Sequence, residues 1–322
     1  MIEILSCGPL VTVQDQGRPG HLAQGLAQGG AADPRARVEA AALLGHDGAG
    51  IELPGAPLRL RLDEPAMVAL TGAPMQARTC DGPLPWHSAH AMPAGTVLDL
   101  RPTGQGVYSY VHLSGGLRTE AVLGSRSAHL IAGIGRPLAA GDRIPFEVTA
   151  LGPALTLTAP ESRFEGGPLR VLPTPQTALF PPEEQARFEA TTFTRDRRGN
   201  RQGVRLAMED AGFATEGQLS LLSDFILPGD VQMTGDGVPY ILGPECQTTG
   251  GYPRIGTVIA ADLPRALQAP PGASLSFQFV TQTQALAARP DAPAVTPLIR
   301  DPATMSDLLS YQLIDGVQSA RD

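Results

Sequence analysis

The sequence predicts a mainly β fold with a few short helices, and two observations carry this prediction. Of its 322 residues, 37 are glycine and 31 are proline, about a fifth of the chain where roughly an eighth is usual. Hydrophobic residues still make up 42%, enough for a packed core, so the frequent turns separate short apolar runs rather than mark a disordered chain. A chain of this length holds two domains or one large one.

Similar segments suggest two related halves. AMPAGTVLDL (91–100) is similar to QAPPGASLSF (268–277), and SGGL (114–117) is similar to TGGY (249–252). The texture of the sequence changes between residues 151 and 167, where the glycine-rich run APESRFEGGP follows an apolar segment. We therefore expect a first half over 1–160, a second half over 161–285 and a tail over 286–322.

Elements of the first half follow from local patterns. Strands are expected over 2–5 and 10–13, and Glu52 lies in another. Asp33 is expected to cap a helix that begins at Pro34 and ends before Gly45. Over 58–62 leucines alternate with arginines, as in a half-buried strand. A further strand over 107–113 ends in Ser-Gly-Gly.

The second half begins with a strand over 169–172, preceded by one over 155–157 at the end of the first half. A helix is expected to start at Pro181-Pro182. A hairpin is expected between Gly229 and Asp236-Gly237, followed by a strand over 238–242. A last helix is expected over 301–317, with its apolar residues on one face.

Charge and cysteine content exclude several classes of partner. The net charge is −8 and the pI is about 5.3, which argues against nucleic acid and against anionic membranes. No export signal and no run of membrane-spanning length is found. The three cysteines, Cys7, Cys80 and Cys246, show no CxxC spacing. We therefore expect a reduced, cytoplasmic location.

The absence of lysine restricts the chemistry. All 24 basic residues are arginine, so the chain supplies no P-loop lysine, no Schiff-base amine and no attachment point for biotin. Codon bias toward arginine explains the number equally well. In either case, every fixed cation is a guanidinium, which suits bidentate contacts to carboxylate or phosphate.

Polar residues on turning backbone are the first candidates for a site. Gln14, Asp15 and Arg18 lie among glycines and a proline, and Arg126 lies between two serines in GSRS. The segment with Gln14, Asp15 and Arg18 is either a ligand-binding loop or a plain surface turn. Arg126 either binds an anion or lies in a capped turn. His87 and His90 have HxxH spacing, but two ligands do not make a zinc site, so no metal is expected.

The segment GPECQTTGGYP (243–253) is the central candidate. Gln247, Thr248 and Thr249 offer neutral donors and acceptors, and Tyr252 adds an aromatic face. Gly250 and Gly251 are expected to allow positive φ and close approach to a ligand. Such a loop suits a small polar molecule with a carboxylate or amide, although a tight strand connection is the alternative.

Five arginines lie within the eleven residues 195–205. Arg201 and Arg205 are four residues apart, so a shared anion is expected between their guanidiniums. That anion is either a ligand or a carboxylate of the chain itself.

Taken in order, TVQDQGRPG, GGAAD, GSRS, RQGVRL and QTTGGYP resemble one family over about residues 1–280. It contains carboxyltransferase-like proteins related to allophanate hydrolase subunit 2, the transferase half of urea carboxylase and the C-type subunit of bacterial 5-oxoprolinase. The resemblance implies two cyclophilin-like β-barrel halves and a homologous B-type subunit as partner. In 5-oxoprolinase a TIM-barrel-like A-type subunit joins them, and ATP drives opening of the 5-oxoproline lactam to glutamate.

The resemblance also implies site residues. The implied catalytic residues are Gln14, Asp15, Arg18, Gln247, Thr248 and Tyr252. The implied substrate-binding residues are Arg126, Gln176, Arg201, Arg205, Gln232, Thr249, Gly250 and Gly251. The chain departs from the family pattern at Ala128, where threonine is usual, and in the spacing of Asp196-Arg197.

The expected function is therefore that of the C-type subunit of an ATP-dependent 5-oxoprolinase, inactive alone, with a small lactam or amide as substrate. ATP with Mg²⁺ is expected to bind through the complex, by arginines, backbone amides and the partner. A carboxyltransferase that moves a carboxyl group between carboxybiotin and urea or a similar amide is the alternative, and only then is biotin involved. A regulatory protein that binds a partner without turnover is the third possibility.

Overall fold

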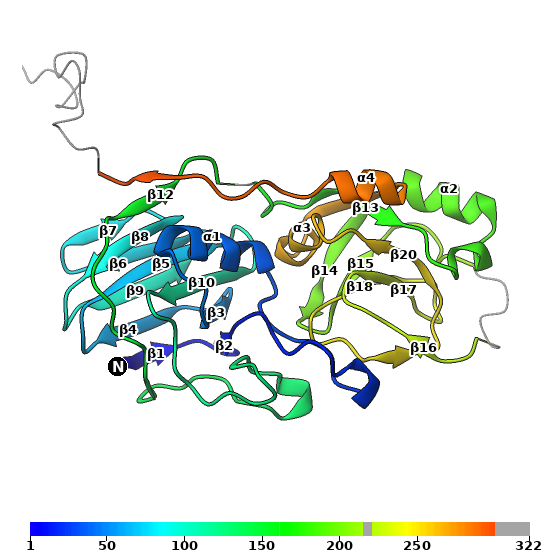
Figure 1. Ribbon diagram of the computed structural model, residues 1–322. Helices are drawn as coiled ribbons and strands as arrows, with labels where there is room; N and C mark the ends of the chain where they lie inside the picture. Colours follow the sequence, from blue (N-terminus) through cyan, green and yellow to red (C-terminus); the bar gives the residue numbers. More distant parts are fainter. Residues whose placement is uncertain (161, 215–220, 300–322) are drawn as a thin grey trace, which may run out of the picture.

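The computed structural model describes residues 1–160, 162–214 and 221–299. Figure 1 shows two β-rich halves side by side, the first in blue to green and the second in green to orange. Short strands dominate the element order, with four short α-helices among the described residues. The prediction of a mainly β chain with a few short helices is confirmed.

The first half contains two sheets. The six-stranded sheet has the order β11-β1-β4-β9-β6-β7. Its strands are β1 (Ile2–Cys7), β4 (Leu58–Leu62), β6 (Met75–Thr79), β7 (Gly82–Leu84), β9 (Val97–Pro102) and β11 (Arg143–Ile144). The seven-stranded sheet has the order β2-β3-β10-β5-β8-β12-β22. Its strands are β2 (Thr12–Gln14), β3 (Gly50–Pro54), β5 (Ala66–Gly72), β8 (Ser88–Met92), β10 (Tyr108–Leu113), β12 (Leu155–Leu157) and β22 (Val295–Pro297).

The second half is a closed barrel with the order β13-β20-β17-β18-β15-β14-β21. Its strands are β13 (Gly167–Leu172), β14 (Phe193–Asn200), β15 (Gly203–Ala207), β17 (Asp230–Met233), β18 (Pro239–Leu242), β20 (Arg254–Val258) and β21 (Ser274–Phe279). Strands β16 (Asp224–Phe225) and β19 (Thr249–Gly250) form a separate two-stranded sheet.

The helices are short and lie around the sheets. The α-helices are α1 (Pro34–Leu44), α2 (Pro182–Ala190), α3 (Leu263–Gln268) and α4 (Gln282–Ala287). The 3-10 helices are η1 (Leu22–Gln24), η2 (Leu130–Ala132) and η3 (Thr177–Leu179). In the part of the chain that the structure describes, no helix has the length and apolar character needed to cross a membrane.

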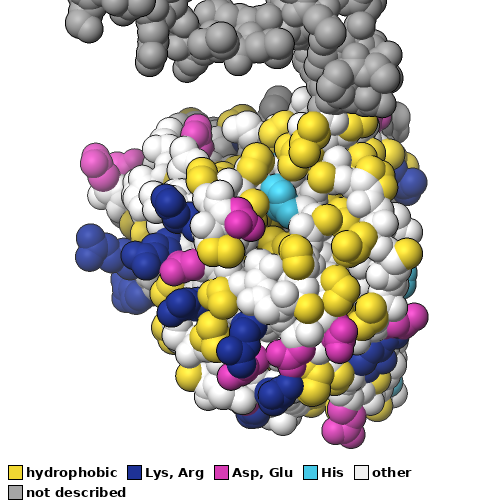
Figure 2. Space-filling model, turned by 90° about the vertical axis from the view of Figure 1, so that its left-hand side faces the viewer, with side chains coloured by type: hydrophobic (Ala, Val, Ile, Leu, Met, Phe, Trp, Pro, Cys, Tyr) yellow, Lys and Arg dark blue, Asp and Glu magenta, His cyan; other side chains and the backbone are white. Residues whose placement is uncertain are grey.

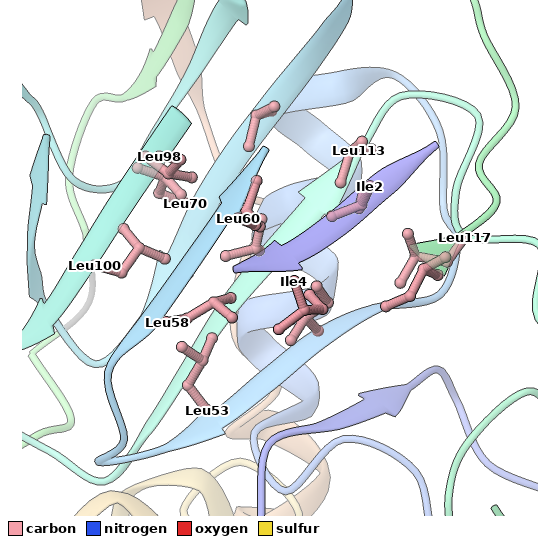
Figure 3. Close-up of a cluster of buried hydrophobic side chains, with 14 of the residues drawn as sticks. Ile2, Ile4, Leu53, Leu58, Leu60, Leu70, Leu98, Leu100, Leu113 and Leu117 are labelled. Carbon is pink, nitrogen blue, oxygen red and sulfur yellow. The ribbon is translucent and has the colours of Figure 1, made fainter. Parts of the chain in front are cut away.

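The core of the first half lies on the inner face of the six-stranded sheet. Leu58, Leu60 and Leu62 of β4 are at most 1% exposed, whereas the arginines between them face outward. Figure 3 shows Leu58 and Leu60 beside Ile2 and Ile4 of β1, and Leu62 belongs to the same core cluster. The alternation predicted for this strand is confirmed, and period-two side-chain direction is its cause.

Aromatic side chains dominate the core of the second half. The ring of Phe188 on α2 stacks on Phe277 of β21, with 4.5 Å between ring centroids. Phe193 and Phe213 pack on the same ring at 5.6 and 5.9 Å. Helix α2 is thereby held against the barrel wall.

Asp33 caps α1 as expected, because its Oδ1 accepts from the Ala36 N–H at 3.1 Å and Gly45 ends the helix with φ of +67°. It also has a second role, which the sequence did not reveal. Its Oδ2 accepts from Arg163 Nε and from Gln268 Nε2, each at 2.8 Å. Gln268 belongs to the second half, so this cap also connects the two halves.

Residues after α4 return to the first half. Strand β22 pairs with β12, and the Leu298 N–H donates to the Ala154 carbonyl at 2.8 Å. Part of the expected tail thus completes a sheet of the first half. The helix expected over 301–317 lies outside the described residues.

The end of the first half presents mixed charge. Figure 2 looks at this end and shows arginine and acidic side chains intermixed with apolar ones. Exposed pairs such as Arg61–Glu3 and Arg143–Asp63 belong to the first-half surface. Isolated exposed pairs of this kind contribute little to stability.

Candidate functional site

The 243–253 loop, which follows β18, sends its side chains in two directions. Glu245 is 2% exposed and lies at the junction of the two halves. Cys246, Gln247 and Tyr252 instead line a pocket beside the barrel. The loop therefore serves both the interface between the halves and the candidate site.

This pocket, called the barrel pocket below, has a volume of about 610 Å³, within the usual range for small-molecule sites. The β14–β15 hairpin, β17, β18 and the 243–253 loop form its walls. The polar residues that line it are Arg197, Arg198, Asn200, Gln202, Gln232, Thr234, Tyr240, Gln247 and Tyr252. Three of the expected site residues, Gln232, Gln247 and Tyr252, thus meet in one cavity.

Gly250 allows two amide side chains to approach each other. A β-carbon at Gly250 would lie 3.0 Å from the amide nitrogens of both Gln232 and Gln247. Neither Gly250 nor Gly251 has a positive φ, so the expectation of left-handed backbone at this pair is wrong. A β-carbon at position 250 would therefore be crowded by these two side chains. The close approach of this backbone to a ligand stays a prediction.

Gln232 has a buried donor without a partner. Its side chain is 5% exposed, and its Nε2 makes no hydrogen bond to any described residue. An unpaired buried polar group costs about 1–3 kcal/mol, and such groups in native proteins call for a reason. An acceptor on a bound ligand would satisfy this N–H.

The positive charge of the barrel pocket comes from the β14–β15 hairpin. Asp196 accepts from Arg198 at 2.9 Å and from Arg205 at 2.6 Å. The hydrogen bonds from Arg198 are the main cause that lowers the pKa of Asp196. Arg197, by contrast, makes no hydrogen bond or ion pair with the described residues. One guanidinium at the pocket rim is therefore available to an anion.

The described lining of the pocket offers no carboxylate or imidazole for acid–base chemistry and no activated thiol. Burial and, to a smaller extent, the nearby Asp230 carboxylate together raise the pKa of the Cys246 thiol to about 12. A thiol with this pKa stays protonated and is a poor nucleophile at neutral pH.

Cys246→Ala is therefore expected to leave turnover of the assembled enzyme within about twofold of wild type, because the protonated thiol only packs in the wall. Steady-state kinetics of the variant in its complex measures this. A loss of activity that tracks alkylation of Cys246, and that is absent in the alanine variant, would show that the thiol takes part.

Mg²⁺–ATP does not fit the barrel pocket by itself. No carboxylate lines it to hold Mg²⁺, and no cluster of three metal-binding side chains occurs in the described ranges. The HxxH pair is engaged in packing: His90 Nε2 bonds to the Pro85 carbonyl at 2.8 Å, and His87 stacks on Phe164. The barrel pocket alone therefore lacks the carboxylates that would hold the Mg²⁺ of a bound nucleotide.

Asp15 organises the GSRS segment. Its carboxylate accepts from the hydroxyls of Ser125 and Ser127 at 2.6 Å, from the Arg126 N–H at 2.7 Å and from the Gly17 N–H at 2.8 Å. Burial alone would raise the pKa of Asp15, but these four donors outweigh it and lower the pKa. The two serines thus bind Asp15, and the Arg126 guanidinium makes no hydrogen bond or ion pair with described residues.

Asp15→Asn is expected to lower the stability most at neutral pH, by about 1–3 kcal/mol, because an amide cannot accept from all four donors. The folded pKa of Asp15 is lowered, so its contribution is present above its unfolded pKa near 3.8 and is lost as pH falls through the folded value. Melting temperatures of both proteins between pH 7 and pH 3 test this. The deficit of the variant should narrow toward pH 3, and a constant deficit would contradict the assignment.

Gln14 and Arg18 support the same segment from the other side. Gln14 Nε2 donates to the Ala128 carbonyl at 3.2 Å. Arg18 is 1% exposed and donates to the carbonyls of Ser127 and Val122. These two side chains and Asp15 lie together, away from the residues that line the barrel pocket.

Arg201 lies at the junction of the halves. Its guanidinium donates to the carboxylates of Glu52 and Glu245 and to the Gly30 carbonyl. Tyr110 completes the cluster by donating to Glu52 Oε2 at 2.7 Å. Arg205 has a different partner, Asp196. The expectation of one anion shared by the two guanidiniums is therefore wrong, because separate carboxylates of the chain pair with Arg201 and with Arg205.

The remaining expected residues lie around the two-stranded sheet. Gln176 Oε1 accepts from the Arg254 backbone N–H at 3.0 Å, and Arg254 in turn pairs with Asp224 and Asp230. Thr249 and Gly250 form β19 itself. Thr248 is nearly buried, with its Oγ1 4.0 Å from the position of a β-carbon on Gly25. Loops from both halves thus meet next to the barrel pocket.

Comparison with known protein families identifies the family of this chain. Residues 24–279 match a family model described as the carboxyltransferase domain, subdomain A and B. The chain belongs to this carboxyltransferase family. The match covers most of both halves, so the barrel pocket and the junction cluster are features of a carboxyltransferase domain.

Relatives of this carboxyltransferase chain are named as enzyme subunits. The C-type subunit of 5-oxoprolinase from Escherichia coli (strain K12) is 33% identical over 297 residues, covering 90% of this chain and 95% of that protein. Its counterpart of the same name in Haemophilus influenzae is 30% identical over 291 residues, covering 88% and 93%. A putative urea carboxylase of Emericella nidulans is 28% identical over 311 residues, covering 89% of this chain but 25% of that protein.

A solved structure shares the fold of the carboxyltransferase chain. TTHA0988 superposes with a TM-score of 0.78 at 29% sequence identity, over 86% of this chain. The chain spans 55% of that longer protein. The family match over residues 24–279 confirms the resemblance to the carboxyltransferase family that the order of motifs indicated.

Several residues of the candidate site were not found from the sequence. Arg197 at the pocket rim, Arg254 behind the loop and Glu245 inside it all escaped selection. A signal for Glu245 was present, since it is the one acidic residue in the 243–253 segment. Nothing local distinguished Arg197 from its arginine neighbours.

Proposed function

We propose that this chain is the C-type subunit of an ATP-dependent 5-oxoprolinase, acting with a homologous B-type subunit and a TIM-barrel-like A-type subunit. The naming of its relatives in Escherichia coli and Haemophilus influenzae supports the proposal. The observation that carries it is the barrel pocket, which joins amide donors and a guanidinium without a carboxylate or an imidazole among its described lining residues.

The proposed substrate matches the pocket in chemistry. A lactam that bears a carboxylate presents one neutral carbonyl and one anion. In the pocket the unpaired Nε2 of Gln232 donates a hydrogen bond to the lactam carbonyl. The Arg197 guanidinium pairs with the substrate carboxylate. Tyr252, half exposed at the rim, provides a flat face for the ring.

The chemical step requires groups from the partner. Opening a lactam requires activation of a poor carbonyl electrophile and a base for the attacking water. The described pocket supplies neither, and ATP with Mg²⁺ must then bind where a partner contributes. This chain accordingly binds and orients the substrate, and the assembled complex activates it.

A carboxyltransferase that uses carboxybiotin and a urea-like amide is the second candidate. The family description and the relative named putative urea carboxylase favour it. The same pocket would hold the amide, but a biotin-bearing partner would be required because the chain has no lysine. A regulatory binder without turnover is the third candidate.

The test is ATP-dependent glutamate formation from 5-oxoproline by the reconstituted complex, with and without avidin. We expect glutamate and ADP in equal amounts and no effect of avidin. Avidin-sensitive carboxylation of urea, with no glutamate, would replace the proposal by the carboxyltransferase. Absence of both activities with tight partner binding would favour the regulatory function.

A further inference from the structure

A second polar pocket lies in the first half, on the side of the GSRS segment. It has a volume of about 220 Å³. Its floor is glycine backbone: a β-carbon on Gly48 would lie 2.9 Å from Gly116 Cα and 3.2 Å from His46 Nε2. A side chain at position 48 would therefore clash with the backbone of Gly116, and the His46 imidazole lies close to the same position. We call this second pocket the glycine pocket.

Three guanidiniums line the glycine pocket, those of Arg37, Arg118 and Arg126. Two carboxylates line it as well, those of Asp15 and Asp47, and Asp47 pairs with Arg37. Arg118 pairs with Glu147, and both side chains are about half exposed, at 45% and 54%. An exposed pair of this kind is weak, so Arg118 can turn to a stronger partner at little cost.

Arg126 has no partner among the described residues, and the structure explains why. Asp15, the carboxylate that contacts this segment, already accepts from four donors, including the Arg126 backbone N–H. The two adjacent serine hydroxyls are also engaged by Asp15. Arg126 therefore lines the pocket without an ion-pair partner among the described residues, and the Asp15 carboxylate lines the same pocket.

We propose that the glycine pocket binds a phosphate group, held by Arg126 and Arg118 with His46 at its edge. Two planar guanidiniums that line one pocket suit a phosphate. Each guanidinium can make a bidentate contact, and a phosphate has enough oxygens to accept from both. The proposal concerns binding to this chain alone and does not depend on the reaction proposed above.

The size of the pocket limits the ligand. Its 220 Å³ falls below the roughly 300–1,000 Å³ of sites that enclose drug-sized ligands. It therefore encloses a single phosphate-sized oxyanion and leaves the rest of any ester outside. The net charge of −8 disfavours general anion binding, so saturable phosphate binding would have to arise from such a local site.

Titration calorimetry of the purified chain with inorganic phosphate tests the proposal, with sulfate, acetate and adenosine monophosphate at equal ionic strength as comparisons. We expect saturable phosphate binding that weakens at least about tenfold in Arg126→Gln and several-fold in Arg126→Lys, since lysine keeps the charge but loses the fork. Arg59→Gln, which removes an exposed arginine from β4, should bind as wild type. Because Arg126 has no partner among the described residues, its variants should melt at the wild-type temperature without phosphate.

The comparison ligands decide the source of the phosphate. Adenosine monophosphate binding as tightly as phosphate would assign the pocket to phosphate esters, and weaker binding would assign it to the inorganic ion; both uphold the proposal. No saturable phosphate binding to the wild type would overturn it. Equal phosphate binding by Arg126→Gln, or acetate binding as tightly as phosphate, would overturn it as well.

Discussion

Arg201→Met is expected to lower the free energy of unfolding by about 3–5 kcal/mol, the largest effect of any substitution considered, because it leaves buried carboxylates without a counter-charge. Glu52 and Glu245 are each at most 2% exposed and both pair with Arg201. Burial would lower the pKa of Arg201, but the two carboxylates raise it above its usual range, so the side chain stays charged. Urea denaturation followed by circular dichroism measures the loss.

Arg205→Met is the matched control. Arg205 has one partner, Asp196, which keeps a second arginine after the substitution. We expect a loss below about 1 kcal/mol for this partly exposed pair. Combining Arg201→Met with Glu52→Gln and Glu245→Gln should restore part of the stability, because the orphaned charges are removed. Equal losses in Arg201→Met and Arg205→Met would contradict the account of the junction.

Gln232→Leu is expected to impair binding without destabilising the chain. A substrate carbonyl left unpaired in the pocket costs about 1–3 kcal/mol, so KM should rise roughly 5- to 150-fold. The free energy of unfolding should be unchanged or higher, because the substitution removes a buried N–H that has no partner in the described protein. Kinetics of the assembled complex and urea denaturation of the chain measure the two effects.

Gln185→Leu is the matched control, and we expect it to affect stability and KM in the opposite way to Gln232→Leu. The Gln185 side chain on α2 donates to the carbonyls of Phe180 at 2.8 Å and Thr177 at 3.2 Å, and it does not line the barrel pocket. We expect lower stability and an unchanged KM. The role given to Gln232 would be wrong if its leucine variant kept the wild-type KM or lost as much stability as Gln185→Leu.

The features of the fold that the sequence predicted correctly depend mostly on interactions between residues that are close in the sequence. Asp33, Pro34 and Gly45 mark both ends of α1 because capping and helix termination depend on neighbouring residues. The leucines of β4 identify its buried face for the same reason. The return of β22 to pair with β12 had no local signal, since it joins segments that are far apart in the sequence.

The candidate site was predictable only in part. The polar character of the 243–253 loop pointed correctly to Gln247 and Tyr252 at a pocket. The spacing of Arg201 and Arg205 could not reveal their partners, because Glu52 lies 149 residues before Arg201 and meets it only through packing of the two halves. The GSRS hydroxyls were likewise committed to Asp15, 110 and 112 residues earlier.

The central claim is that this chain binds and orients the substrate but cannot turn it over without a partner. The most direct measurement is 5-oxoproline-dependent ADP release by this chain alone and with the B-type and A-type partner proteins. The account predicts turnover only in the complete mixture and none from the chain alone, because no carboxylate and no imidazole is among the described residues that line its pocket. Equal turnover by the chain without its partners would contradict it.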